Sequence, residues 1–296
     1  MWHLVLGMRK VVKYKQTFES GEVRCRVCYF KCRLSPGDVG RCLVRTNIGG
    51  ELYNVAYGLL SRMDVVHARD LPMAEGKGLW LKVGSVGCNL RCPGCAFWDL
   101  AWNRPVGGEG TRRVEPAQLV EEAVSNGCVG LCFGYTEPLA VLEYVQEAFA
   151  IAKKRGMNTA LYTNGTFTSE VAQDIVKVCD AFIVDLKAYS REAFRRVSGN
   201  AYMSVEVMET VEELFRLGSR VELITRLIPG YNDSVFEIRS IARWIAMKLS
   251  PDVVWHLVPF RPVPNLYHVP ATGADRLIEA SRIAEEEGVK RVILHQ

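Results

Sequence analysis

Three closely spaced cysteines form the pattern with the clearest chemical meaning in this sequence. Cys88, Cys92 and Cys95 are separated by three and two residues, with Pro93-Gly94 turning the chain between the last two. Each iron of a [4Fe–4S] cluster takes one thiolate, so three cysteines leave the fourth iron open for another ligand. A zinc site is the alternative, but zinc sites usually draw on two half-sites, and no partner half-site follows. The spacing therefore predicts a cluster with an open iron.

A second group of four cysteines precedes it. Cys25, Cys28, Cys32 and Cys42 lie in a short, basic, turn-rich segment. Four thiolates can close a tetrahedral zinc shell or hold a second iron–sulfur cluster, and either metal would help to order a segment too small for its own core. We expect a structural metal here, with a second cluster and disulfides as alternatives. The remaining cysteines stand in or beside apolar runs and are expected in the core: Cys128, Cys132 and Cys179.

Composition and charge exclude several classes of protein. The chain has 296 residues, of which 49% are hydrophobic and 24% charged, which argues against disorder. Its 37 basic and 33 acidic residues leave a charge of +4, so a nucleic-acid partner is not expected. No apolar stretch is long enough to span a membrane, and Met1 to Lys15 reverses the order of a signal peptide. We therefore expect a cytoplasmic protein. In that reducing compartment, ten cysteines indicate metal ligation more than disulfides.

The elements that position these cysteines follow from periodicity. Short apolar runs alternate with helical patterns, and prolines and glycines mark the helix ends. Strands are expected at Leu79–Val83, Val129–Phe133, Thr159–Thr163, Ala181–Leu186, Val221–Leu227, Val253–Val258 and Val289–Leu294. Such alternation predicts an α/β fold, a partial or full (β/α) barrel over 76–296, preceded by a cysteine-rich segment over 1–75.

Polar residues follow several of these strands. Barrel enzymes place their chemistry at the C-terminal ends of strands, and the three cysteines come directly after the first one. Each polar group alone is most simply a turn or a strand end that meets water; their shared position favours a common site. The candidates are Tyr135, Thr136 and Glu137, then Asn164, Asp185, Lys187 and Arg226. His256, inside an apolar run, is more simply a core histidine than a pocket residue.

With these residues in place, the sequence resembles the radical S-adenosylmethionine (SAM) superfamily, and within it the pyruvate formate-lyase activating enzyme branch. The resemblance implies that the open iron binds SAM, that Glu137 accepts from the SAM amino group, and that the Asp185-x-Lys187 segment approaches SAM. The family usually has an aromatic residue before the third cysteine. This chain has Gly94 there, so we expect Phe97 or Trp98 to contact the adenine.

The N-terminal cysteines, with Arg45 and Asn47 after them, resemble the radical SAM enzymes of the AmmeMemoRadiSam system over about residues 22 to 296. That branch usually has a basic, proline-containing stretch before the first barrel strand, and Ala68 to Gly78 differs from it. The resemblance implies reductive cleavage of SAM to a 5′-deoxyadenosyl radical and an electron donor of the flavodoxin or ferredoxin type. The substrate is a glycyl-radical enzyme, another protein or a small molecule.

Two other classes of function compete with this interpretation. A metal-dependent barrel hydrolase would use closely spaced histidines and carboxylates, but the five histidines include no close pair. A zinc-binding nucleic-acid module could use the basic segments near the N-terminus, but it would leave the barrel pattern without a role. Glycine-rich phosphate motifs are also missing, so neither ATP nor a dinucleotide is suggested.

Overall fold

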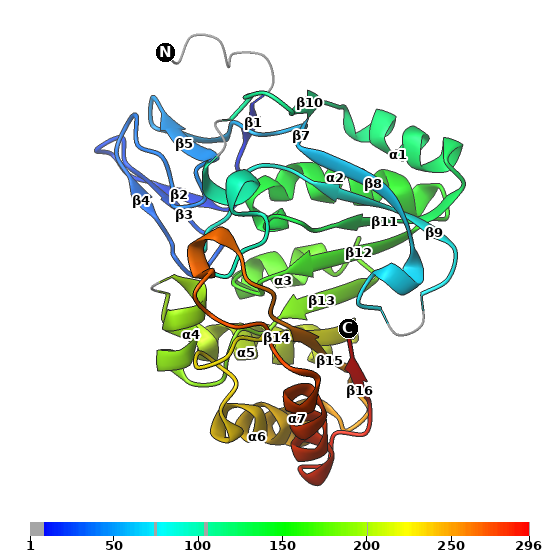
Figure 1. The fold of residues 1–296 in the computed structure, drawn as a ribbon. Helices are drawn as coiled ribbons and strands as arrows, with labels where there is room; N and C mark the ends of the chain where they lie inside the picture. The colour runs from blue at the N-terminus through cyan, green and yellow to red at the C-terminus, as the bar shows by residue number, and fades with distance from the viewer. Residues whose placement is uncertain (1–8, 74–75, 104–105, 200, 296) are drawn as a thin grey trace.

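The computed structural model describes residues 9–73, 76–103, 106–199 and 201–295. Its centre is an eight-stranded sheet in the order β16-β15-β14-β13-β12-β11-β9-β8 (Figure 1). The strands are β8 (Arg62–His67), β9 (Leu79–Gly84), β11 (Cys128–Phe133), β12 (Asn158–Thr163), β13 (Ala181–Asp185), β14 (Arg220–Leu227), β15 (Trp255–Pro259) and β16 (Val292–Leu294).

The seven expected strands all form, in the expected order. Each pairs in parallel with its neighbour, as βα units require. The antiparallel strand β8, which runs back along β9, was not expected from the sequence. Strands β8 and β16 form the two edges, so the sheet is an open, partial barrel rather than a closed one.

In the described ranges seven α-helices connect and cover the strands, and Figure 1 shows α2 and α3 behind the sheet. They are α1 (Pro116–Ser125), α2 (Leu142–Lys154), α3 (Ser169–Ile175), α4 (Arg191–Ser198), α5 (Ser204–Arg216), α6 (Val235–Trp244) and α7 (Ala274–Glu286). Short 3₁₀ segments occur at Ala68–Asp70, Pro138–Val141 and Pro264–Leu266, and π-helical turns at Asp99–Asn103 and Ile245–Leu249.

Helix boundaries follow the expected signals, with one difference. Pro116 begins α1, and Gly127, which follows the helix, has a positive φ. The Ser234 hydroxyl caps α6 by accepting from the Glu237 N–H, as the capping-box pattern predicts. The Glu237 carboxylate instead accepts from the Tyr189 N–H at 2.7 Å, so it ties the loop before α4 to α6.

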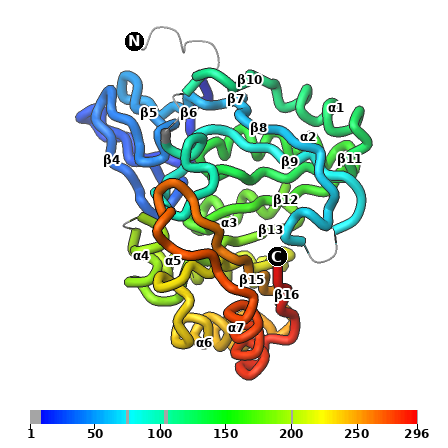
Figure 2. Tube along the Cα trace, viewed as in Figure 1, coloured from blue at the N-terminus to red at the C-terminus, as the bar shows by residue number. Residues whose placement is uncertain are grey.

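The N-terminal segment forms small antiparallel sheets, one of them with a short strand from beyond β9. Figure 2 shows the β4 and β5 region on the side of the molecule toward which the β13 arrow points in Figure 1. The sheets comprise β1 (Lys10–Val11), β6 (Glu51–Asn54) and β5 (Arg45–Ile48), then β2 (Lys15–Thr17), β3 (Val23–Cys25) and β4 (Arg33–Leu34), and the pair β7 (Leu59–Leu60) and β10 (Arg112–Arg113).

This segment and the barrel share one hydrophobic core. Val23 and Leu52 belong to the same buried cluster as Leu81 and Phe133. Residues 74–75, at the boundary expected from the sequence, lie outside the described residues. No helix among the described residues is both long and apolar enough to cross a bilayer.

Candidate active site

A cavity of about 300 Å³ opens at the C-terminal ends of the parallel strands. Cys88, Cys92 and Cys95 line it together. Most of the residues expected at the strand ends line it too: Tyr135, Thr136, Glu137, Asn164, Asp185, Lys187 and Arg226. Residues from five strands and their loops thus meet at one place, as the parallel topology predicts.

The loop that carries the three cysteines is held by its own backbone. Gly87 has a φ of +94°, and a Cβ there would lie 2.6 Å from the Cys42 carbonyl oxygen. Only glycine allows this conformation and this close approach. The Cys95 N–H donates to the Cys92 oxygen at 3.1 Å, which closes the turn at Pro93-Gly94.

Burial and nearby cations act on the three thiols in opposite directions. Burial raises the pKa of Cys92 to about 11, while Lys187 lowers it. Burial likewise raises the pKa of Cys95, and Lys187 and Arg226 lower it. Metal ligation needs thiolates, so these two cations favour the ligating form.

Glu137 is a buried carboxylate at the end of β11. Its oxygens accept from the Thr163 hydroxyl at 2.7 Å, the Asn164 N–H at 2.8 Å and the Leu139 N–H at 3.1 Å. Burial raises the pKa of Glu137 to about 7 despite these bonds. A carboxylate has about four acceptor positions, so about one remains for a ligand in the cavity.

Asn164 connects β12 to the cysteine loop. Its side-chain amide lies 2.8 Å from Asn89 Oδ1 and 4.0 Å from Cys88 Sγ. Its oxygen accepts from both the N–H and the hydroxyl of Thr166. Asn164 is therefore fixed in place beside the first cysteine.

Asp185 and Lys187 form a half-buried ion pair inside the cavity. Burial alone would lower the pKa of Lys187, but Asp185 and Cys92 raise it above its usual value. The Asp185 Oδ1 atom is buried, and it has no hydrogen-bond partner among the described residues. One carboxylate oxygen therefore remains available to a bound molecule.

Tyr135 and Thr136 line the wall next to β9. Tyr135 has a φ of +63°, and its hydroxyl donates to Asp64 at 2.6 Å. The Thr136 hydroxyl donates to the Ser85 oxygen at 3.1 Å. These bonds hold the wall against the start of the cysteine loop.

The two expected aromatic contacts separate in the structure. Phe97 lines the cavity, whereas Trp98 is not among its lining residues and packs against Trp102 at 5.9 Å between ring centroids. A Cβ at Gly94 would lie 3.1 Å from Ile228 and 3.5 Å from Phe260. Apolar side chains from later strands thus occupy the space beside Gly94.

Sequence reasoning missed several residues of the cavity wall, among them Lys82 and Tyr162. Lys82 lies inside β9, with its ammonium 4.3 Å from the centre of the Tyr135 ring and 5.9 Å from that of Tyr162. A lysine within an otherwise apolar strand was the available signal, because buried lysines need a reason.

His256 is a core residue and not part of the cavity lining. It is 1% exposed, and its ring nitrogens lie 2.8 Å from Glu222 and 2.9 Å from His295. His295 itself lines the cavity, and burial lowers its pKa.

The three cysteines outside both groups, Cys128, Cys132 and Cys179, are buried as expected.

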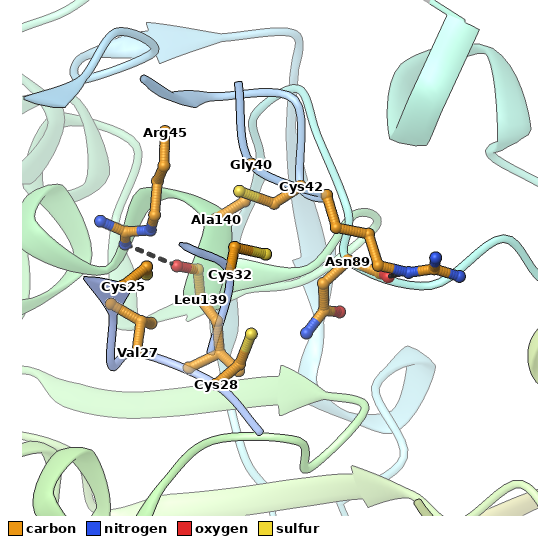
Figure 3. Close-up of a pocket in the computed structure, with 11 residues that line it drawn as sticks. Cys25, Val27, Cys28, Cys32, Gly40, Cys42, Arg45, Asn89, Leu139 and Ala140 are labelled. Atoms are coloured by element: carbon orange, nitrogen blue, oxygen red, sulfur yellow. Dashed lines mark hydrogen bonds between the residues drawn. The ribbon is translucent and has the colours of Figure 1, made fainter. Parts of the chain in front are cut away.

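The four N-terminal cysteines surround a separate small pocket (Figure 3). All ten cysteines of the chain are free, so no disulfide joins them. Arg45 lies beside them, buried and bonded to Glu143 at 2.8 and 3.1 Å. Burial raises the pKa of Cys25 to about 12 and of Cys28 to about 11, and Arg45 lowers the first while an Asn89 hydrogen bond lowers the second.

Neither cysteine group converges on a point. In the part of the chain that the structure describes, no three cysteine, histidine or carboxylate side chains are arranged to hold a single metal ion. Tetrahedral zinc with Zn–S bonds of about 2.3 Å would bring its thiolates to about 3.8 Å from one another. The described side chains therefore do not form a closed tetrahedral site as they stand.

Comparison with known proteins agrees with this geometry. The model of the radical SAM superfamily matches residues 83–244. An uncharacterised protein of Methanocaldococcus jannaschii is 29% identical over 291 residues, which are 97% of this chain and 85% of that protein. The pyruvate formate-lyase-activating enzyme of Staphylococcus aureus is 24% identical over 189 residues, 59% of this chain and 72% of that enzyme.

A solved structure has a similar fold. The radical SAM methyltransferase from Sphaerobacter thermophilus aligns with a TM-score of 0.59 and 14% identity, over 97% of this chain and 76% of that one. The matched family region spans the three cysteines and most of the cavity-lining strands. The chain belongs to the radical SAM superfamily.

Proposed function

We propose that this protein holds a [4Fe–4S] cluster through Cys88, Cys92 and Cys95 and uses it to cleave SAM for hydrogen abstraction. The observation that carries the proposal is that three thiols on one loop line the same cavity as the strand-end residues. The donor set fits the cluster, because one loop offers three soft thiolate ligands, one for each of three irons, at the same cavity. When bound, the reduced cluster supplies the electron that splits SAM into methionine and a 5′-deoxyadenosyl radical.

The cavity's own residues would bind and orient SAM. Glu137 has about one free acceptor position for the amino group, and Asp185 Oδ1 is another acceptor without a partner. Arg226, on β14, is a cation in the same cavity and suits the SAM carboxylate. Asn164, Tyr135 and Thr136 shape the wall between them, and Phe97 is the aromatic surface for adenine. Lys187, held by Asp185, places positive charge near the thiolates.

The substrate of this protein is a glycyl-radical protein, another protein or a small molecule. Because a pyruvate formate-lyase-activating enzyme is among the relatives, we propose activation of a glycyl-radical protein as one reading. A small molecule or another protein is the alternative. Reduction of the cluster needs an electron donor, for which we propose a flavodoxin or ferredoxin. Ten free cysteines support a cytoplasmic location, where thiols stay reduced.

For the four N-terminal cysteines we propose a second iron–sulfur cluster. Their thiols surround a pocket (Figure 3) that is also lined by Asn89, the residue after Cys88, and this adjacency to the other cysteine group favours a redox cluster over the zinc ion expected from the spacing. The Arg45 guanidinium beside Cys25 and Cys42 offsets negative charge on the ligated thiolates. The Arg45 charge is itself held by Glu143 and, through Glu143, by Asn54.

The two cysteine groups adjoin each other. Asn89 lines the N-terminal pocket, while Cys88, the residue before it, lines the large cavity. The Arg41 Nε donates to the Asn89 oxygen at 2.8 Å, and Arg91 donates to the Arg41 oxygen at 2.6 Å. This adjacency supports electron transfer from the N-terminal cluster to the SAM-binding one. We propose residues 76–296 as the catalytic domain, with 1–75 as its metal-binding extension.

Anaerobic reconstitution tests the main proposal. The reconstituted protein, given SAM and dithionite, is expected to form 5′-deoxyadenosine, measured by chromatography. The variant Cys88→Ala/Cys92→Ala/Cys95→Ala is expected to form none. The matched control is Cys128→Ala/Cys179→Ala, which changes two buried cysteines outside the cavity and should retain activity. Deoxyadenosine formation by the triple variant would contradict the proposal.

A further inference from the structure

Lys82 lies deeper in the barrel than the residues proposed to bind SAM. It is two residues before Gly84, the end of β9, and it is paired in register with Cys132 of β11. Two strand residues span about 7 Å, so Lys82 lies that far below the strand end. Its side chain nevertheless lines the same cavity.

Two tyrosines frame the Lys82 ammonium. Its Nζ lies over the Tyr135 ring at 4.3 Å and faces the Tyr162 ring at 5.9 Å. The Asp64 carboxylate, whose charge acts on Lys82, accepts hydrogen bonds from Tyr135 at 2.6 Å and from Arg62 at 2.7 Å. Burial lowers the pKa of Lys82.

The ammonium has three donors, yet no hydrogen-bond acceptor or ion-pair partner for it is found among the described residues. Cation–π contact with the two tyrosines offsets only part of the cost of taking an ammonium out of water. Lys82 is half-buried and lines the cavity, so its charge remains available to a molecule bound there. A purely structural lysine at this place would be expected to reach a carboxylate, as Lys187 reaches Asp185.

We propose that Lys82 binds an anionic group of the substrate, a carboxylate or a phosphate, at the floor of the cavity. The site is the Lys82 ammonium framed by Tyr135 and Tyr162, with the cavity leading up from it to the three cysteines. The proposal rests on the proposed function for its meaning, because it places the substrate below SAM. Its test does not require SAM cleavage.

Anion binding to the reconstituted, oxidised protein tests this site. SAM is present at saturation, so that its own carboxylate already occupies the cofactor position, and no reductant is added. The probes are succinate and inorganic phosphate, which distinguish the two sources of charge, with neutral succinamide for comparison. Affinity is measured by isothermal titration calorimetry.

Lys82→Met and Lys82→Gln are expected to weaken binding of the preferred anion by at least about tenfold, the effect of losing one charge-assisted hydrogen bond. Lys82→Arg is expected to retain most of the affinity. SAM affinity should change less than about twofold in all three, which separates the loss from general damage. The control is Lys248→Met, which changes an exposed lysine.

Equal anion affinity in the wild type and both neutral variants would overturn the proposal. So would the absence of binding of either anion to the wild type, or equal binding of succinamide. Deoxyadenosine formation by the wild type is measured separately and decides the proposed function on its own. A failure of the Lys82 proposal is therefore distinguishable from a failure of the proposed SAM cleavage.

Discussion

The side-chain amide of Asn164 donates a hydrogen bond of 2.8 Å to the Oδ1 atom of Asn89. Asn89 completes the connection by donating to the Thr166 hydroxyl at 2.7 Å. The first residue follows β12, and the second follows Cys88, so the pair joins a strand end to the cysteine loop. Asn89 also lines the N-terminal cysteine pocket. Asn89 therefore links the end of β12, the loop of Cys88 and the N-terminal cysteine pocket.

Asn89→Ala is expected to lower the free energy of unfolding of the cluster-free protein by about 1–3 kcal/mol, because it leaves buried partners unsatisfied. Urea denaturation measures the change. The control Asn158→Ala removes an exposed side chain with one bond of 3.3 Å and should cost less than about 0.5 kcal/mol. Equal costs would show that the Asn89 bonds do not hold the loop.

Gly87→Ala tests the close approach of the cysteine loop to the N-terminal segment. Gly218→Ala is a matched control, because Gly218 also has a positive φ, +78°, but nothing lies within 4 Å of its Cβ position. The control should cost about 1–2 kcal/mol for the backbone alone. Gly87→Ala should cost more, because the Cys42 carbonyl must move. Thermal unfolding compares the two, and indistinguishable melting temperatures would contradict the expectation.

The metal content per chain distinguishes a second cluster from a zinc ion at the N-terminal cysteines. With two [4Fe–4S] clusters, the reconstituted protein should contain about eight irons per chain, and Cys25→Ser/Cys28→Ser about four. The variant should still cleave SAM with dithionite but should lose turnover with a flavodoxin or ferredoxin. Metal and sulfide analysis of both proteins measures this. About one zinc and four irons in the native chain would instead show a structural zinc site.

Glu137→Gln is expected to weaken SAM binding by about tenfold, because an amide is a poorer acceptor for an ammonium group. The iron content should not change, since Glu137 is not proposed as an iron ligand. Equilibrium binding and iron analysis on the same sample measure both quantities. Loss of iron, or unchanged affinity for SAM, would contradict the assignment.

The raised pKa of Glu137 also predicts a pH dependence of stability. Its pKa is about 7 in the folded protein, against 4.5 for the ordinary value, so the folded state binds the proton more tightly. This favours folding below pH 4.5, and the contribution is lost as pH rises toward 7. The loss is up to about 3 kcal/mol. In urea unfolding of the cluster-free protein, Glu137→Gln should lack this pH-dependent part of the free energy of unfolding. Identical pH profiles for the wild type and the variant would contradict the prediction.

Much of this protein follows from local patterns in its sequence. The order of the parallel strands, the place of the three-cysteine loop after the first of them, and the burial of Cys128, Cys132 and Cys179 were all predicted correctly. These features depend on residues close together along the chain. Parallel topology then brings strand ends to one side, which is why most strand-end candidates line one cavity.

Other features depended on contacts between distant segments. β8 joins the sheet through pairing with β9, Phe97 rather than Trp98 lines the cavity, and Lys82 meets Tyr135 and Tyr162 from other strands. The pocket that the four N-terminal thiols share with Asn89 and Leu139 was also beyond spacing alone, because those two residues come from distant parts of the chain. The sequence by itself determined which residues could do chemistry and in what order they occur. Only the tertiary structure decided which of them meet, because side-chain direction and distance depend on packing between segments far apart in the chain.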